Sequence, residues 1–186
     1  WTDEIIVIDN YSTDNTIKIA KRYADKLFIR KGGKYDTIED NKNFGLRNAA
    51  KNWVLVIDAD EIVTEECKKE ILLKINDDKY DAFYFNFKQF FFGKAFIGPL
   101  WTKTRIIRLV RKGKGFYENT GPHNILTVRG KIGRIKNPIH HYGYPDIETF
   151  VSKMNKYTSL DAKLISEGKK AGLLKKPVKI NFYYLL

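Results

Sequence analysis

The sequence predicts one α/β domain over residues 1–186, in which a mostly parallel sheet is followed by an antiparallel β extension and a C-terminal helix. Three observations lead to this prediction. Short apolar runs alternate with amphipathic, helix-like segments through the first half of the chain. From about residue 82 onward, the apolar runs are separated by turns that contain glycine. A last segment with helical spacing begins at Asp146.

The first half alternates strands and helices with short links, which favours parallel strands joined by right-handed crossovers. Its strands are short apolar runs, and its helices have apolar side chains at helical spacing. Turn and capping residues at 10–14, among them Asp14, separate the first strand from the first helix. The expected elements are a strand at 3–9, a helix at about 15–24, a strand at 26–30 and a helix at about 41–51.

The stretch at residues 53–61, Trp-Val-Leu-Val-Ile-Asp-Ala-Asp-Glu, is expected to be a central strand that ends in acid. Its apolar run is too short for a helix and rich in branched side chains, which indicates cover on both faces. Ligands of open α/β sheets bind beyond the carboxyl ends of strands, where Asp58, Asp60 and Glu61 would lie. Adjacent carboxylates need a cation, and Mg²⁺ or Mn²⁺ holding a diphosphate would supply one. Alternatively, the acids only lead into the next helix.

The second half begins with an amphipathic helix and then changes to antiparallel β structure. The single cysteine, Cys67, is expected to be a buried residue of that helix. The long helix after Asp146 is expected to pack on the core. The expected elements are a helix at 64–75, strands at 82–87, 105–110 and 125–128, and a helix at about 146–166 with Phe150, Met154, Tyr157, Leu160 or Asp161, and Leu164 along one face.

One cysteine excludes an internal disulfide framework and indicates a reducing compartment. No run approaches the roughly 20 apolar residues of a membrane span, and no signal peptide is visible. We therefore expect a cytoplasmic protein. The chain begins at Trp1 and enters a strand almost at once, so we also expect that an N-terminal portion is missing.

The net charge of +12 is concentrated between Lys88 and Lys136, where twelve Lys and Arg residues face a single acid, Glu118. Such a segment attracts polyanions such as nucleic acid, anionic lipid head groups or phosphorylated glycans, unless it is only a solvated face. The tail at 173–186 mixes lysines with aromatic and leucine side chains. That composition fits either an interfacial segment or a helix whose partner lies elsewhere.

Several stretches in this order resemble the inverting family 2 glycosyltransferases with a GT-A fold. They are residues 5–16, residues 41–45 (Asn-Lys-Asn-Phe-Gly) and residues 53–61. Further stretches resemble the branch that adds glucose or a similar sugar to the lipopolysaccharide inner core. They are residues 108–115, 128–137, 139–144 and 153–157. The resemblance implies a GT-A Rossmann-like fold and transfer of a sugar, glucose from UDP-glucose being favoured, to a saccharide hydroxyl with inversion.

The resemblance also implies site residues and a Mn²⁺ or Mg²⁺ cofactor. Asp9, with Asn10, would bind the donor nucleoside, because a carboxylate accepts hydrogen bonds from a base or a ribose hydroxyl. Asp58 would face the ribose and the metal, and Asp60 would ligate the metal directly and take part in catalysis. The remaining implied contacts are His141 as a third metal ligand, and Lys42 and Asn43 as donor-binding residues. His140 is expected to point to the opposite face of its strand.

Two departures from the family concern the donor pocket and the catalytic base. The strand and helix that normally precede Asp3 and complete the nucleoside pocket are absent. Asn124 follows His123 where the branch has a glutamate, and an asparagine cannot accept a proton as a general base. Glu118 is the nearest candidate for that role, with a lone salt-bridge partner as the alternative interpretation.

We expect residues 1–87 to bind the nucleotide sugar and residues 88–186 to bind an anionic glycan or glycolipid acceptor. We also expect peripheral association at the inner face of an anionic membrane.

Two rival functions remain open. A sugar nucleotidyltransferase would use a related fold and similar acids. A nucleic-acid-binding module would use the basic segment with Phe90–Phe92, Phe96 and Trp101 for stacking, but it leaves Asp9, Asp58 and Asp60 without a role, so nucleic acid is not the expected partner.

Overall fold

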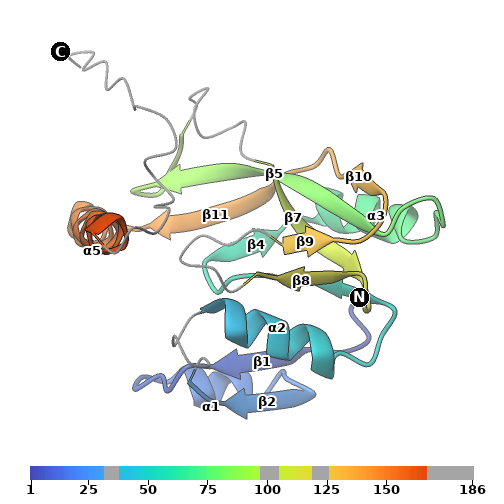
Figure 1. Cartoon of the computed structure of the whole chain (residues 1–186), viewed down its shortest axis with the longest axis horizontal. Helices are drawn as coiled ribbons and strands as arrows, with labels where there is room; N and C mark the ends of the chain where they lie inside the picture. Colours follow the sequence, from blue (N-terminus) through green and yellow to red (C-terminus); the bar gives the residue numbers. More distant parts are fainter. Residues whose placement is uncertain (32–37, 97–104, 119–125, 167–186) are drawn as a thin grey trace.

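The computed structural model describes residues 1–31, 38–96, 105–118 and 126–166, and it confirms the α/β class (Figure 1). A small parallel sheet pairs β1 (Ile6–Asp9) with β2 (Lys26–Ile29). The helix α1 (Thr16–Ala20) joins them, shorter than expected, and Asp14 accepts the Thr16 N–H at its start. The helix α2 (Ile38–Asn48) lies between this small sheet and the larger one.

The larger sheet has seven strands and is mixed in direction. Its path runs β3 (Trp53–Leu55), β7 (Arg105–Arg111), β5 (Ala82–Phe91), β11 (Ile139–Tyr144) and β4 (Glu61–Val63), with β6 (Lys94–Ala95) and β10 (Ile132–Arg134) also paired to β5. Strands β10 and β11 run parallel to β5, and the other pairs are antiparallel. A separate hairpin pairs β8 (Gly115–Tyr117) with β9 (Leu126–Val128).

The stretch at 53–57 was expected in the centre of the sheet, and this expectation is wrong for the sheet as described. Strand β3 ends the path, pairs only with β7, and its side chains are half-buried. The centre belongs to β5, whose ten residues place Phe83, Phe85 and Phe87 in the core on alternate positions. A longer alternating aromatic strand buries more apolar surface than a three-residue run, and therefore it takes the central place.

The helix α3 (Glu65–Lys74) covers this core, as its pattern predicted. Thr64 caps it by accepting the Cys67 N–H at 3.2 Å. Cys67 is fully buried with Ile71 against β5, and burial raises the pKa of its thiol to about 12. The expectation of a buried structural cysteine is confirmed, and this thiol is not reactive at neutral pH.

The helix α5 (Ile147–Ser166) forms where expected, with Asp146 accepting the Thr149 N–H at 2.7 Å. It does not pack on the core: it lies past the C-terminal ends of β5 and β11, and Ile147 is 64% exposed (Figure 1). Its attachment is aromatic, because the Phe150 ring lies 5.2 Å from Tyr144 and 6.1 Å from Phe91 between ring centres. The side chains of Leu160, Asp161 and Leu164 lie outside the described residues. Within the described ranges, no helix has the length and apolar character needed to cross a membrane.

Candidate functional site

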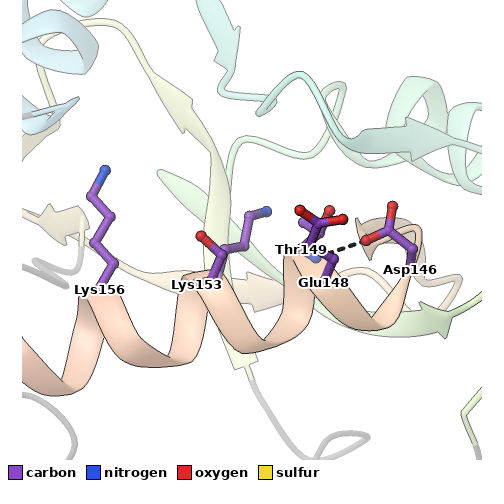
Figure 2. Close-up of a pocket in the computed structure, with 6 residues that line it drawn as sticks. Asp146, Glu148, Thr149, Lys153 and Lys156 are labelled. Atoms are coloured by element: carbon purple, nitrogen blue, oxygen red, sulfur yellow. Dashed lines mark hydrogen bonds between the residues drawn. The ribbon is translucent and has the colours of Figure 1, made fainter.

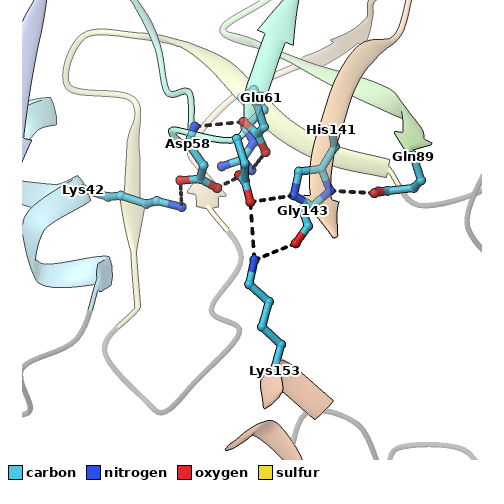
Figure 3. A network of polar contacts seen from close by, with 9 residues as sticks. Lys42, Asp58, Glu61, Gln89, His141, Gly143 and Lys153 are labelled. Atoms are coloured by element: carbon cyan, nitrogen blue, oxygen red, sulfur yellow. Dashed lines mark hydrogen bonds and ion pairs between the residues drawn. The ribbon is translucent and has the colours of Figure 1, made fainter. Parts of the chain in front are cut away.

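The predicted acids lie in a tight turn between β3 and β4 (Figure 3). The Glu61 N–H donates to the Asp58 carbonyl at 3.0 Å, and the Asp58 N–H donates to the Glu61 carboxylate at 2.9 Å. The Tyr142 N–H donates to the Asp60 carbonyl at 2.8 Å, which fixes the turn to β11. Strand β4 was not predicted, and it turns Glu61 inward, where that residue is buried.

Asp58 is held between two cations. Its carboxylate lies 2.8 Å from Lys42 Nζ on α2 and 2.7 Å from Arg108 on β7, and Arg108 also pairs closely with Glu61. Burial works to raise the pKa of Asp58, but Arg108 and Lys42 outweigh it and leave that pKa below its ordinary value. For Glu61 burial prevails, and its pKa is raised in spite of Arg108.

Two buried polar atoms beside this network have no hydrogen-bond partner among the described residues. They are Arg108 Nε and the hydroxyl of Tyr117, a residue at the end of β8 that sequence reasoning did not single out. Burial raises the pKa of Tyr117 to about 12, so the phenol stays protonated and keeps a free donor. Unpaired buried polar groups are uncommon in folded proteins and mark places where a ligand or ordered water is expected.

Asp60 faces a second cluster on β11 and α5. Its Oδ2 lies 3.3 Å from His141 Nε2 and 3.7 Å from Lys153 Nζ. The hydrogen bond to His141 is the main reason that the pKa of Asp60 lies below its ordinary value, and Lys153 adds to the effect. Both the Asp60 and the His141 side chains remain partly exposed.

His141 is oriented from behind by Gln89 on β5. Its Nδ1 lies 2.6 Å from Gln89 Oε1, an acceptor, so Nδ1 carries the proton. Nε2, which faces Asp60 in this structure, is then the ring nitrogen that could ligate a metal in place of that contact, and metal-binding histidines are commonly held from behind in this way. A Cβ at Gly143 would come within 2.9 Å of the His141 ring, so a larger residue there would force the ring to move. His140 packs 5.1 Å from the Phe90 ring, on the other side of the strand as expected.

Other predicted donor contacts lie on neighbouring elements. Asp9 ends β1, is 4% exposed, and accepts the Ser12 N–H at 2.8 Å, while Asn10 beside it is exposed. The side chain of Asn43 accepts the Tyr117 N–H and donates to the Tyr117 carbonyl, both at 2.8 Å. Asn43 therefore joins α2 to β8 in this structure. A donor contact from it stays a prediction.

Two positions bear on the catalytic base, 118 and 124, and the structure describes the first of them. Glu118 follows β8, is exposed, and accepts a hydrogen bond from the Thr127 hydroxyl at 3.2 Å. Among the described residues, no hydrogen bond or ion pair joins Glu118 to the acidic turn. Asn124, like His123 and Trp101, lies outside the described residues.

The sequence profile described as Glycosyl transferase family 2 matches residues 2–133. This chain belongs to that family. An uncharacterized glycosyltransferase of Rickettsia typhi is 30% identical over 197 residues, covering 99% of this chain and 66% of the relative. A second, from Rickettsia prowazekii, is 31% identical over 182 residues, covering 91% of the chain and 61% of the relative. The chain thus spans less than two thirds of the length of either relative.

A third relative bears on the branch of the family. It is the lipopolysaccharide core biosynthesis glycosyltransferase LpsC of Rhizobium meliloti, 24% identical over 192 residues, covering 98% of the chain and 70% of LpsC. The similarity supports a place near the lipopolysaccharide branch of family 2. The α/β architecture agrees with the GT-A Rossmann-like fold that the resemblance implied, so both expectations are confirmed.

The basic segment of this family 2 glycosyltransferase is less uniform than its sequence indicates. Arg108 is one of the twelve cations of this segment, but it is 5% exposed and neutralises Asp58 and Glu61. Arg111 pairs with Asp78 at 2.7 Å and lies over the Trp53 ring. A net charge counted along the chain misses such acids because they come from earlier elements.

The aromatic cluster expected to stack nucleic-acid bases is largely occupied within the fold. Phe90 stacks on Tyr142 with ring centres 4.3 Å apart, and Phe91 stacks on Tyr144 at 4.8 Å. Only Phe92 and Phe96 of the cluster's described residues remain substantially exposed. The rings therefore support β11 and α5, which weakens the nucleic-acid alternative.

A divalent cation was expected on Asp58, Asp60 and His141. Among the described residues, no group of three His, Cys, Asp or Glu side chains is gathered closely enough to hold a metal. Asp58 is turned toward Lys42 and Arg108, whereas Asp60 and His141 face each other with oxygen and nitrogen donors. These two residues could hold a divalent ion only together with ligands from outside the chain, such as a diphosphate and water, and the cation stays a prediction.

Proposed function

We propose that this chain binds a nucleoside diphosphate sugar at the β3–β4 turn and transfers the sugar, with inversion, to a saccharide or lipid-linked glycan. UDP-glucose is the favoured donor. The observation that carries the proposal is that the two aspartates of the turn have different partners. Asp58 pairs with the cations Lys42 and Arg108, whereas Asp60 lies partly exposed beside His141. Family membership supports the reaction class.

In this proposal the residues act in two groups. Asp9 and Asn10, at the end of β1, bind the nucleoside, since a buried carboxylate there accepts hydrogen bonds from the base or ribose. Asp58, held in place by its two cations, accepts a ribose hydroxyl, and Lys42 places positive charge near the diphosphate. The paired side chains of Asp60 and His141 would hold Mn²⁺ or Mg²⁺.

When bound, the divalent ion would neutralise charge on the departing nucleoside diphosphate. The chain itself would position the acceptor hydroxyl and remove its proton. Glu118 is the proposed base, because it is an exposed carboxylate at the start of the segment that contains Asn124. A bond from the acceptor oxygen to the sugar C1 forms as the C1–oxygen bond to the diphosphate breaks.

The acceptor half is proposed to be residues 88–186, with residues 1–87 binding the donor. LpsC acts in lipopolysaccharide core biosynthesis by its name, and the exposed lysines of the second half, such as Lys88, Lys112 and Lys131, suit an anionic glycan or glycolipid. Peripheral contact with an anionic membrane at the cytoplasmic face is part of the same proposal.

The test is a donor panel. UDP-, GDP- and ADP-sugars are incubated with core oligosaccharide acceptors, with and without Mn²⁺, and the release of nucleoside diphosphate is measured. Release of UDP that requires acceptor supports glycosyl transfer. Release of pyrophosphate from a nucleoside triphosphate and a sugar phosphate would instead identify a nucleotidyltransferase.

A further inference from the structure

The cations around the acidic turn come from three elements, and one of these is unexpected. Lys42 belongs to α2 and Arg108 to β7, both within the body of the fold. Lys153 belongs to α5, the helix at the edge of the molecule, and still reaches Asp60 (Figure 3). In the sequence this lysine is one residue of the stretch 153–157, which resembles the lipopolysaccharide branch, and no role was predicted for it.

The ammonium of Lys153 is only partly engaged. Its Nζ donates to the Gly143 carbonyl at 2.8 Å and lies 3.7 Å from Asp60 Oδ2, a distance that is electrostatic contact but too long for a hydrogen bond. An ammonium has several N–H donors, so at least one remains for a ligand. The side chain is 37% exposed, as is that of Asp60, so a ligand can reach both.

The position of this ammonium is set by the start of α5. Asp146 caps the helix, and Phe150 packs against Tyr144 and Phe91. The Lys153 Nζ also lies 5.5 Å from the centre of the Tyr144 ring, which holds the aliphatic stem against β11. The helix thus delivers a fixed positive charge to the acidic turn.

A polar hollow of about 420 Å³ adjoins this lysine along the same helix (Figure 2). It is lined by Asp146, Glu148, Thr149, Ser152, Lys153 and Lys156. Lys156 lies one turn beyond Lys153 and makes no ion pair with a described residue. Lys156 is therefore a matched control: it has the same charge and the same helix, but no contact with Asp60.

We propose that Lys153 is a diphosphate-binding residue, and that α5 is in this way part of the donor site. The proposal rests on the proposed function. On donor binding, the ammonium would keep its bond to Gly143 and donate to a phosphate oxygen held beside Asp60, sharing the negative charge that the leaving diphosphate gains. The acceptor's proton goes to the base.

The test compares Lys153→Met, Lys153→Arg and Lys156→Met with the unaltered chain. Methionine retains most of the stem that packs on Tyr144 while removing the charge. Calorimetry with UDP and with UMP, in Mn²⁺, measures the affinities. Because a charge-assisted hydrogen bond is lost, we expect Lys153→Met to weaken UDP about tenfold or more and UMP less. Lys153→Arg should recover much of the UDP affinity, and Lys156→Met should leave it unchanged.

Two results would overturn the inference. One is equal UDP affinity in Lys153→Met and Lys156→Met. The other is unchanged UDP affinity together with tighter Mn²⁺ binding in Lys153→Met, which would make Lys153 a competitor for Asp60. If the unaltered chain binds no UDP at all, the proposed function itself fails. Thermal unfolding by circular dichroism shows whether α5 is still docked in each variant. If Lys153→Met undocked the helix, the affinities for UDP and UMP would fall alike, and Lys153→Arg would not restore them.

Discussion

Removing Arg108 should destabilise the fold strongly, and the loss should depend on pH. Arg108 is 5% exposed and faces two carboxylates, Asp58 and Glu61, the second of which is almost fully buried. Arg108→Met would leave both without this partner. Breaking a buried ion pair on one side costs about 3–5 kcal/mol in the free energy of unfolding. For a domain of this length that corresponds to a fall in Tm of about 6–20 °C.

The pH dependence follows from the direction of the pKa shift at Glu61. Burial raises that pKa above its ordinary value of 4.5 even with Arg108 present, and loss of the cation raises it further. A raised folded-state pKa contributes stability that is present below the unfolded pKa and is lost as pH rises through the folded one. The deficit of Arg108→Met relative to the unaltered chain should therefore be smaller near pH 5 than near pH 8.

Urea denaturation followed by tryptophan fluorescence at several pH values measures this deficit. Adding Glu61→Gln to Arg108→Met should recover part of the lost stability at pH 8 but little at pH 5. Lys68→Met, which removes only an exposed pair with Glu65, is the control and should cost no more than about 0.5 kcal/mol. A deficit below about 1 kcal/mol, or one that is equal at both pH values, would refute the account of this network.

Further substitutions test two other parts of the site. Gly143→Ala places a Cβ within 2.9 Å of the His141 ring, so His141 should be displaced from Asp60. The Mn²⁺-dependent part of UDP binding, measured by calorimetry, should then fall. If this part is unchanged, His141 has no role in it. Glu118→Gln should lower turnover about 10²- to 10⁴-fold with UDP affinity intact if Glu118 is the base. If instead Asn124→Glu raises turnover and Glu118→Gln has no effect, the base was lost at position 124.

Much of the fold could be predicted from local patterns. The strand that ends at Asp9, the capped helix after Thr64 and the buried Cys67 all follow from the spacing of apolar side chains and from capping residues. The central strand was misplaced because a short apolar run has the same local pattern at the edge of a sheet as in its centre. The sign that β5 and not β3 is the central strand is the greater length of β5, which has ten residues.

The acids of the site were identified from the sequence, but their partners were not. Arg108 is 50 positions from Asp58 and 47 from Glu61, and Gln89 is 52 positions from His141. Such pairs are created by strand pairing, which carries no local sequence signal. Strand β4 in particular decides that Glu61 points inward, and a three-residue strand between two acids and a helix is too short to recognise.

The most direct test of the proposed function is UDP binding to the acidic turn, measured by calorimetry with Mn²⁺ and again with excess EDTA. Because Asp60 and His141 need a cation to lie beside a diphosphate, the affinity should be present in Mn²⁺ and largely lost in EDTA. Asp60→Asn should abolish the Mn²⁺-dependent part, while Asp3→Asn, at an exposed acid outside the turn, should leave it intact. Equal UDP affinity in Mn²⁺ and EDTA, and in both variants, would contradict the assignment of this turn as the donor site.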